Sequence, residues 1–317
     1  MIDVIGAAFD LCGLWQGSRL GPAAIRLAGL QQALAELGYE VCDHGDVGTG
    51  DLPVEEEGLC NFSPLLSCVR DLRHRSLLSL QQGSLPLILG GDHTLAVAGV
   101  SAALQQHGEN VALLWIDAHT DINTPGTSST GNLHGMPLAA LCGFESGVGG
   151  TEDQQWTTLL KALGPGPKLK SENIAWYAIR DVDAPERARL NGLAITMHEI
   201  DRYGIVETMN RFDQWLRSIG ASHLWISFDV DALDPILAPG TGTGVRGGLS
   251  YREAHLMAEL MHEALINDQC PYKLAGVDIV ETNPLRDTNN ATALMAVEWI
   301  ASLLGKTILG SAGRLSL

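Results

Sequence analysis

The sequence has few basic residues, no long apolar run and no closely spaced pair of cysteines. Its 317 residues include 20 Lys and Arg against 37 Asp and Glu, a formal net charge of −17. Such a balance repels phosphate backbones and anionic lipids, so neither nucleic acid nor a membrane is an expected partner. The longest apolar runs, such as VALLWI at 111–116, are strand-sized and far short of the ~20 residues of a membrane span.

The amino-terminal residues also lack the features of an export signal. Position 3 is acidic, no basic segment precedes the first apolar run, and that run is short. The six cysteines form no CxxC pair, and a chain of this length does not need disulfides to hold its core. We therefore expect a cytoplasmic location and free thiols. Apolar residues make up 45% of the chain, which argues against disorder.

Short apolar runs that end in Gly, Asp or Glu alternate with helix-like segments. The expected strands lie at 3–10, 86–93, 111–117, 173–181, 223–231 and 273–281. The expected helices lie at 22–38, 63–80, 251–266 and 291–305. This alternation predicts an α/β fold in which helices cover both faces of a mostly parallel sheet. Sheets of this type bind ligands beyond the carboxyl ends of their strands.

The least regular part of the chain is 143–172, where Gly and Pro cluster around one short helical pattern. Strand-like runs continue in the same style on both sides, so we interpret this segment as a surface excursion and not as a linker. Residues 1–317 are therefore expected to form a single domain.

The strongest functional signal is DAHTD, which directly follows the apolar run VALLWI. Side chains two residues apart in an extended chain point the same way, so Asp117, His119 and Asp121 can converge at a strand end. Any one such motif is usually a turn or a cap. DAHTD is stronger evidence for a functional site here, because similar patterns occur at two other strand ends.

SFDVD places Asp229 and Asp231 on one face after a second strand, and GGDH brings His93 to the tip of a third. Four carboxylates at one point repel one another strongly unless cations lie between them. Carboxylate and imidazole donors without thiolate favour Mn²⁺ before Zn²⁺, with Mg²⁺ less favoured because of the histidines. Two ions bridged by shared aspartates leave room for a bridging water, which such a pair converts to hydroxide near neutral pH. The pattern predicts a binuclear metal centre.

Four segments together resemble the signature segments of the arginase family of ureohydrolases. They are GGDHT (90–94), DAHTDINTP…GNLHGMP (117–137), SFDVDALDP (227–235) and GVDIVETNP (276–284). Similar stretches at 17–30 and 179–186 extend the resemblance over nearly the whole chain. The resemblance implies a three-layer α/β/α fold, two Mn²⁺ per subunit and hydrolysis of a guanidino group with release of urea. A homo-oligomer, trimer or hexamer, is expected by the same analogy.

The resemblance also assigns the metal ligands. One manganese ion would be held by His93, Asp117, Asp121 and Asp229. The second would be held by Asp117, His119, Asp229 and Asp231. Asp117 and Asp229 would therefore bridge the two ions. Asp92 points away by strand alternation and Asp234 precedes Pro235, so we expect both to make turns or supporting hydrogen bonds.

The reacting group of the substrate would meet three side chains. A planar, cationic guanidinium calls for a carboxylate, and Glu281 matches the family's guanidinium-binding glutamate. His134 in GNLHG matches the family's proton-shuttling or general-acid histidine, and its unperturbed pKa near ~6.5 suits giving a proton to a leaving amine. Asp121 is expected to pass a proton from the metal-bound water to that amine.

The rest of an amino-acid substrate would be held by loop residues that the resemblance supplies. Asn123, Ser128 and Thr130 would bind the α-carboxylate. Asp183 would bind the α-amino group, and Glu186 would contact it through water.

We therefore expect manganese-dependent hydrolysis of L-arginine to L-ornithine and urea by a metal-bridging hydroxide. The alternative is another ureohydrolase acting on agmatine, guanidinobutyrate or a related guanidino compound, for which binding of the α-groups would be poor. A binuclear phosphoesterase would need Arg, Lys or a Gly-rich nest for phosphate, whereas this acidic site favours a cation. A non-catalytic relative would have lost a ligand or Glu281, and all are present.

Overall fold

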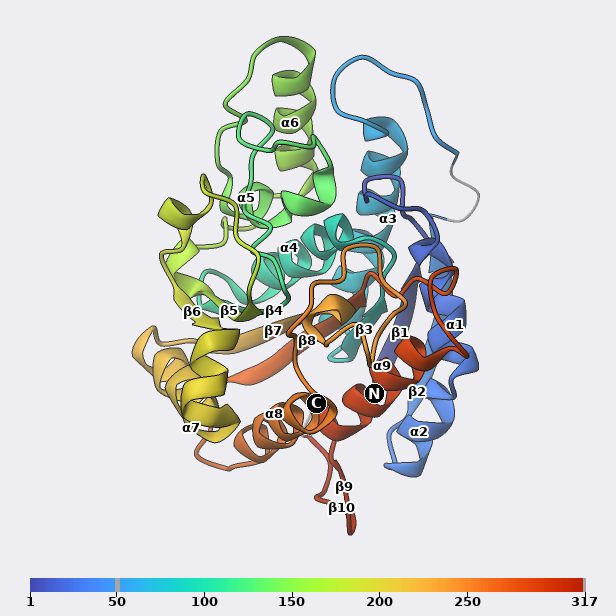
Figure 1. Cartoon of the computed structure of the whole chain (residues 1–317), viewed down its shortest axis with the longest axis vertical. Coiled ribbons are helices and arrows are strands. Elements are labelled where there is room, and N and C mark those ends of the chain that lie inside the picture. Colours follow the sequence, from blue (N-terminus) through green and yellow to red (C-terminus); the bar gives the residue numbers. More distant parts are fainter. Residues whose placement is uncertain (49–51, 316–317) are drawn as a thin grey trace.

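A central sheet of eight strands lies between two layers of helices in the computed structural model, which describes residues 1–48 and 52–315 (Figure 1). The strands are β1 (Ile2–Ala7), β2 (Val41–Val47), β3 (Leu85–Leu89), β4 (Val111–Ile116), β5 (Ile174–Ile179), β6 (Leu193–Thr196), β7 (His223–Asp229) and β8 (Lys273–Val280). Their order is β2-β1-β3-β8-β7-β4-β5-β6, and every neighbouring pair is parallel. The expected three-layer α/β/α architecture is confirmed.

The two helical layers cover opposite faces of this sheet and enclose two apolar cores. One layer contains α3 (Phe62–Gln81), α4 (Ala96–His107), α5 (Pro137–Cys142) and α6 (Gly150–Ala162). The other contains α1 (Gly21–Leu27), α2 (Leu30–Glu36), α7 (Met197–Ser218), α8 (Tyr251–Leu265) and α9 (Ala291–Leu303). Alternation along β1 sends Val4 into one core and Ile5 into the other. A small hairpin of β9 (Lys306–Thr307) and β10 (Gly310–Ser311) projects below α8 and α9 in Figure 1.

Three of the four expected helices, at 63–80, 251–266 and 291–305, correspond to α3, α8 and α9. The fourth, 22–38, is two helices, because Gly29 adopts a left-handed conformation with φ 95° and ends α1 before α2 begins. Sequence analysis missed β2, β6, α4 and α7. The sequence did not predict β2, because most of its side chains are polar and exposed, unlike those of the buried strands.

The irregular segment 143–172 contains α6, which packs on α3 and α5 as part of a helical layer. Trp156 in α6 is buried, and its indole N–H donates to the carbonyl of Phe144. The neighbouring Gln155 accepts a hydrogen bond from the backbone N–H of Leu59 and thereby joins two distant parts of the chain. The segment is thus a packed helix with surface loops. The assignment of one domain to the whole chain stays a prediction.

None of the helices in residues 1–48 and 52–315 is both long enough and apolar enough to cross a membrane. The thiols of Cys12, Cys42, Cys60, Cys142 and Cys270 are unpaired, as the sequence predicts.

Strand order brings the candidate residues together. β3, β8, β7 and β4 are consecutive neighbours at the middle of the sheet, and all four run in the same direction. Parallel strands end at a common edge, and the segments that leave these four strands carry the predicted metal ligands and Glu281.

Candidate metal centre and substrate pocket

The first side-chain cluster surrounds His93, which starts a short 3-10 helix just after β3. Its Nδ1 lies 3.0 Å from Asp117 Oδ2, 3.2 Å from Asp121 Oδ2 and 3.2 Å from Asp229 Oδ2. The aspartates follow β4 or end β7, so three strand ends contribute. These four residues are the set predicted for the first ion.

The second cluster shares Asp117 with the first. His119 Nδ1 lies 3.1 Å from Asp231 Oδ2 and 3.3 Å from Asp117 Oδ1. The two oxygens of Asp117 therefore face different imidazoles. Asp229 contacts His93 through Oδ2, while its Oδ1 accepts the backbone N–H of Asp231 at 2.7 Å. The bridging roles of Asp117 and Asp229 stay predictions.

The protonation of His93 is fixed by residues behind it. Ser227 Oγ donates to Asp278 Oδ1, so it is left to accept from Nε2–H of His93, 2.8 Å away. In the neutral imidazole, Nδ1 is then a lone pair that faces three carboxylate oxygens, and these carboxylates raise the pKa of His93 well above its usual value against the effect of burial. His93 Nδ1 and Asp117 Oδ2 are both buried and take part in no hydrogen bond. Lone pairs that face one another in this way repel unless a cation lies between them, so the donor set fits divalent ions.

The supporting residues Ser227, Asp278 and Trp115 were not singled out from the sequence. Asp278 also accepts from Trp225 Nε1, and the Trp115 ring stacks on His93 with ring centroids 3.8 Å apart. A buried aspartate within the apolar strand β8 was the available signal, because such a group needs partners.

The pKa values of the carboxylates reflect their crowding. Burial and the charge of Asp117 raise the pKa of Asp121 to about 7. Burial, Asp231 and Asp117 raise the pKa of Asp229 well above its usual value. For Asp117, burial raises the pKa, but the nearby imidazoles of His119 and His93 outweigh this effect and lower it. The centre therefore holds more negative charge than it can stabilise without cations.

Asp121 and Glu281 have left-handed backbones, with φ 47° and φ 61°. This conformation is uncommon for residues other than glycine and costs of order 1 kcal/mol or more, so packing around the site must enforce it. It turns each side chain at the point where the chain leaves β4 or β8. Strain at two predicted site residues is typical of functional sites.

Buried Glu281 and partly buried His134 form a pair beside the metal centre. Glu281 Oε1 accepts from the backbone N–H of His93 and from Nδ1–H of His134, each at 3.0 Å. Burial lowers the pKa of His134, but the hydrogen bond and charge of Glu281 outweigh it and raise the pKa to about 9. The predicted guanidinium-binding carboxylate is therefore paired with the predicted proton-transfer group.

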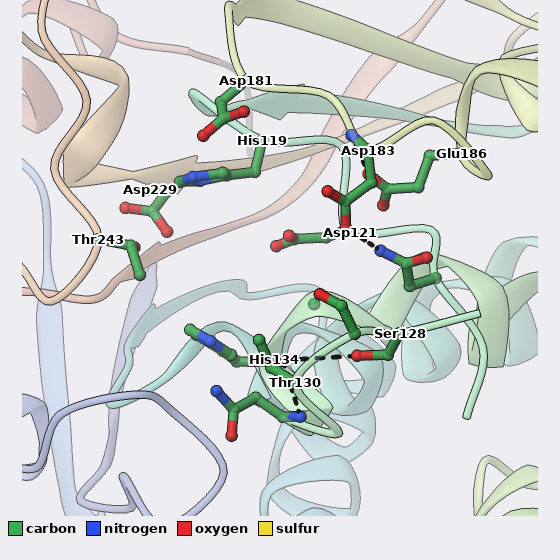
Figure 2. Close-up of a pocket in the computed structure, with 14 residues that line it drawn as sticks. His119, Asp121, Ser128, Thr130, His134, Asp181, Asp183, Glu186, Asp229 and Thr243 are labelled. Atoms are coloured by element: carbon green, nitrogen blue, oxygen red, sulfur yellow. Dashed lines mark hydrogen bonds between the residues drawn. The ribbon is translucent and has the colours of Figure 1, made fainter. Parts of the chain in front are cut away.

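A cavity of about 160 Å³ opens next to these clusters (Figure 2). Its lining contains most of the predicted site residues: His119, Asp121, Asn123, Ser128, Thr130, His134, Asp183, Glu186 and Asp229. Glu281 is not in the lining, because it lies beneath His134 and is only 3% exposed.

The loop residues expected to bind α-groups also hold one another. Asn123 Nδ2 donates to Asp183 Oδ2 at 2.9 Å, and Ser128 Oγ lies 3.5 Å from Thr130 Oγ1. Glu186 is buried and accepts the backbone N–H groups of Ile122 at 2.9 Å and Asp183 at 3.1 Å. These bonds join the loop after β4 to the loop after β5. Glu186 thus has an evident positioning role in addition to the predicted contact.

Sequence analysis missed Asp181, Thr243 and Arg180. Asp181 and Thr243 line the cavity, and Thr243 Oγ1 donates to Asp231 Oδ2 at 3.0 Å. The guanidinium of Arg180 donates to backbone carbonyls of Asp231 and Val245, at 2.6 and 2.7 Å, and so holds the loops that carry Asp231 and Thr243. No local sequence motif identifies a residue such as Arg180, whose partners lie 50 or more positions away in the chain.

Asp92 and Asp234 have the supporting roles expected of them. Asp92 accepts the backbone N–H groups of Thr94 and Cys12, which caps the short helix at His93 and fixes the loop after β1. Asp234 accepts the N–H groups of Ile236 and Gly247 and closes the loop after Asp231.

Known proteins resemble the chain over almost its whole length. The Arginase family model matches residues 1–305. An arginase of Staphylococcus aureus (strain COL) is 38% identical over 325 aligned residues, which cover 97% of this chain and 98% of the relative. The native structure of the Bacillus caldovelox arginase superposes with a TM-score of 0.86 at 35% identity, covering 97% of this chain and 99% of that one.

A structure described as a hypothetical agmatinase from Burkholderia thailandensis is more distant, with a TM-score of 0.69 at 25% identity over 95% of this chain and 84% of that one. The match to the Bacillus caldovelox arginase is closer in sequence and in structure. The chain belongs to the arginase family and is a hydrolase of the ureohydrolase type.

Proposed function

We propose that this protein hydrolyses L-arginine to L-ornithine and urea in a manganese-dependent reaction. One observation carries the proposal: two imidazole–carboxylate clusters share Asp117, and the Glu281–His134 pair lies beside them. The shared carboxylate supports a pair of cations, and the buried carboxylate of Glu281 supports a cationic substrate. Similarity to arginases over 97% of the chain supports arginine as that substrate.

The proposed ligands of the first ion are His93, Asp117, Asp121 and Asp229, and those of the second are Asp117, His119, Asp229 and Asp231. Oxygen and imidazole donors without thiolate favour Mn²⁺. When bound, such a pair of ions makes water a nucleophile near neutral pH and stabilises the charge that develops on the substrate.

We assign the guanidinium to Glu281. A carboxylate held by the N–H of His93 has a fixed orientation, and it can accept two hydrogen bonds from a planar guanidinium. His134 covers Glu281 and already occupies one of its oxygens. The imidazole must therefore turn aside or share that oxygen when the substrate binds. Either movement brings a proton donor next to the scissile bond.

His134 and Asp121 would then move protons. The pKa of about 9 keeps His134 protonated at neutral pH while it pairs with Glu281, so it can donate to the leaving amine of ornithine. Asp121 lies at the rim of the first cluster and lines the cavity, which suits transfer of a proton from the attacking water to the amine.

The α-groups of arginine would be bound by the two joined loops. Asn123, Ser128 and Thr130 supply amide and hydroxyl groups for the carboxylate, and Asp183 supplies a carboxylate for the ammonium group. Glu186 holds both loops and would contact the ammonium group through water. Agmatine lacks the α-carboxylate and 4-guanidinobutyrate lacks the α-amino group, so each of them would leave part of this set unused.

The test is urea release by Mn²⁺-loaded protein supplied with L-arginine, agmatine and 4-guanidinobutyrate in parallel. The proposal expects a strong preference for arginine, with activity lost on chelation and in His119→Ala. Preference for agmatine or guanidinobutyrate would overturn the roles of Asn123, Thr130 and Asp183 while leaving the metal chemistry intact. Absence of urea with all three substrates would overturn the proposal.

The trimer or hexamer and the cytoplasmic location expected from the sequence stay predictions. Sedimentation equilibrium of the Mn²⁺-loaded protein measures the first, and fractionation of the source cells measures the second.

A further inference from the structure

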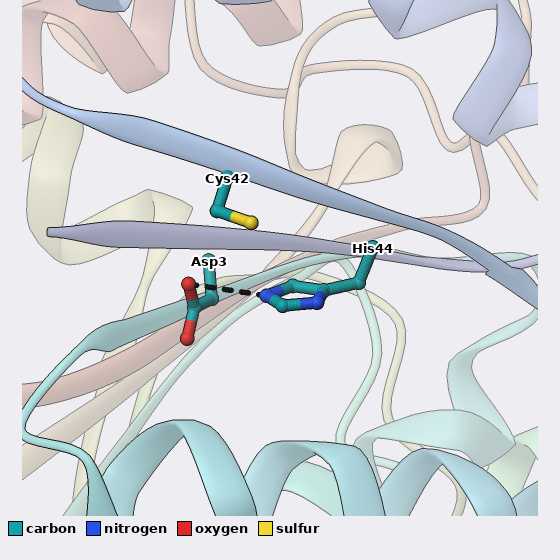
Figure 3. Close-up of side chains that lie close together, drawn as sticks. All are labelled: Asp3, Cys42 and His44. Atoms are coloured by element: carbon teal, nitrogen blue, oxygen red, sulfur yellow. Dashed lines mark ion pairs between the residues drawn. The ribbon is translucent and has the colours of Figure 1, made fainter.

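A second kind of metal-binding cluster lies at the edge of the sheet, away from the candidate centre. Asp3 of β1 and Cys42 and His44 of β2 each offer a ligand atom, and the three atoms lie within 4.8 Å of one another (Figure 3). Asp3 is buried, while Cys42 and His44 are exposed. The metal-centre residues belong to other strands, so this group plays no part in the proposed reaction.

The backbone places these three side chains together. Asp3 pairs directly with Cys42 in the parallel ladder of β1 and β2, so both side chains leave the same face of the sheet. The register shifts between Val4 and Gly6, where β2 has one residue more than β1. Gly45 lies in this bulge with φ 70°. His44 also lies in this bulge, and its imidazole is close to Asp3.

The carboxylate of Asp3 is 2% exposed and lacks the partners that such burial requires. Its Oδ1 is buried and accepts no hydrogen bond in the part of the chain that the structure describes. His44 Nε2 lies 3.1 Å from this oxygen, close enough for an ion pair but outside hydrogen-bond alignment. Arg75 donates to the backbone carbonyl of His44.

The aspartates on the other face of β2 contrast with Asp3. Arg26 forms ion pairs with Asp43 at 2.7 Å and with Asp46 at 2.5 Å. Asp3 forms no ion pair with a lysine or arginine among the residues described. A buried carboxylate beside an imidazole nitrogen, with no aligned hydrogen bond, is also the arrangement of Asp117 and His93 in the candidate centre.

We propose that Asp3, Cys42 and His44 bind one Zn²⁺ ion through carboxylate oxygen, thiolate sulfur and imidazole nitrogen. The Cys42 thiol loses its proton to solvent when the metal–sulfur bond forms. Thiolate selects zinc over manganese, so this site and the catalytic centre differ in metal preference. Three protein ligands leave one tetrahedral position for water. Because two ligands are exposed, the ion can enter without unfolding of the strand.

Zinc at this position would join the first strand of the chain to the edge strand of the sheet. Among the residues that the structure describes, β2 pairs with β1 alone and carries mostly exposed polar side chains, so few apolar contacts hold it. An ion that binds the folded and not the unfolded chain stabilises the fold by RT ln(1 + [Zn²⁺]/Kd). The proposal is independent of the proposed reaction, because no catalytic group takes part.

The experiment uses Mn²⁺-loaded protein titrated with Co²⁺ as a spectroscopic substitute for Zn²⁺. A thiolate ligand gives Co²⁺ a near-ultraviolet charge-transfer band, which the oxygen and nitrogen donors of the candidate centre do not. We expect this band to reach its maximum at one equivalent of Co²⁺ and to disappear when Zn²⁺ displaces the Co²⁺. Cys42→Ser and His44→Gln should lose it or weaken Co²⁺ binding at least about tenfold. Cys60→Ser and His198→Gln change exposed residues elsewhere and should keep it.

A second measurement needs no variant. Zn²⁺ should protect Cys42 of the wild-type protein from alkylation, while exposed Cys60 stays reactive. Urea release should be unchanged in Cys42→Ser, which shows that the variant is folded. The proposal is overturned if the band persists in Cys42→Ser, if wild-type protein gives no band, or if Zn²⁺ leaves the alkylation of Cys42 unchanged.

Discussion

The Nδ1–H group of His134 donates to Oε1 of Glu281 over 3.0 Å, so one oxygen of the proposed guanidinium-binding carboxylate is occupied before any substrate arrives. Glu281 is buried and His134 is partly buried, and the charge of Glu281 raises the pKa of His134 to about 9 against the effect of burial. Substrate binding and proton transfer are therefore coupled through one carboxylate. A cation that takes over Glu281 weakens the interaction that holds the proton on His134.

Replacing Glu281 should affect both functions. In Glu281→Gln the guanidinium loses its charged partner, and kcat/KM for arginine should fall about 10²-fold or more, corresponding to the 2–5 kcal/mol cost of truncating a buried charge pair. The pKa of His134 should also fall toward ~6.5, measured by NMR on metal-free protein. Glu207→Gln, on the exposed surface of α7, is the control. An unchanged kcat/KM would refute the assignment of Glu281.

The His134–Glu281 pair should make stability depend on pH. The folded pKa of His134 lies above its unfolded value, so its contribution is fully present below about pH 6.5 and is lost as pH rises through 9. In metal-free protein, His134→Asn should lower the unfolding free energy by up to about 3 kcal/mol at pH 6 and by much less at pH 10. Denaturant unfolding measures both. A difference that stays constant with pH would contradict the pairing, and His198→Asn serves as the exposed control.

Replacing the shared carboxylate should lower the bound metal content more than replacing an unshared one. Asp117 faces both His93 and His119, whereas Asp231 contacts only His119 of the two. Asp117→Asn should therefore lose both ions on dialysis, and Asp231→Asn should lose one of them preferentially. Elemental analysis of dialysed protein gives the stoichiometry, with exposed Asp201→Asn as control. Two tightly held manganese ions in Asp117→Asn would show that Asp117 does not bridge.

Ser227 should matter although it touches no substrate. It accepts from His93 Nε2–H and donates to Asp278, which keeps the His93 Nδ1 lone pair directed at the aspartates. Ser227→Ala should weaken Mn²⁺ binding about 10- to 100-fold. KM for arginine should be nearly unchanged once metal is saturating. Ser218→Ala, an exposed serine on α7, should leave Mn²⁺ affinity unaltered. Equal Mn²⁺ affinities in both variants would show that Ser227 does not orient His93.

The sequence by itself determined the fold class and the candidate metal ligands. Buried parallel strands need continuous apolar runs, and these are visible locally, as in VALLWI before Asp117. The period of two within an extended chain determines that Asp117, His119 and Asp121 share a direction. Polar β2 and the break at Gly29 were missed, because neither an exposed edge strand nor a left-handed glycine changes the hydrophobic period enough.

Tertiary structure decided which strand ends meet and what supports them. Strand order places β3, β8, β7 and β4 side by side, although their segments lie up to about 190 positions apart in the chain. Three features of the site depend on such long-range neighbours. They are the orientation of the His93 lone pair, the covering of Glu281 by His134 and the contacts of Arg180 with distant loops. The same is true of Asp3, which becomes a buried carboxylate next to Cys42 and His44 only when β1 and β2 pair. Local sequence sets the direction of each side chain, whereas only packing of distant strands sets its partners and its charge state.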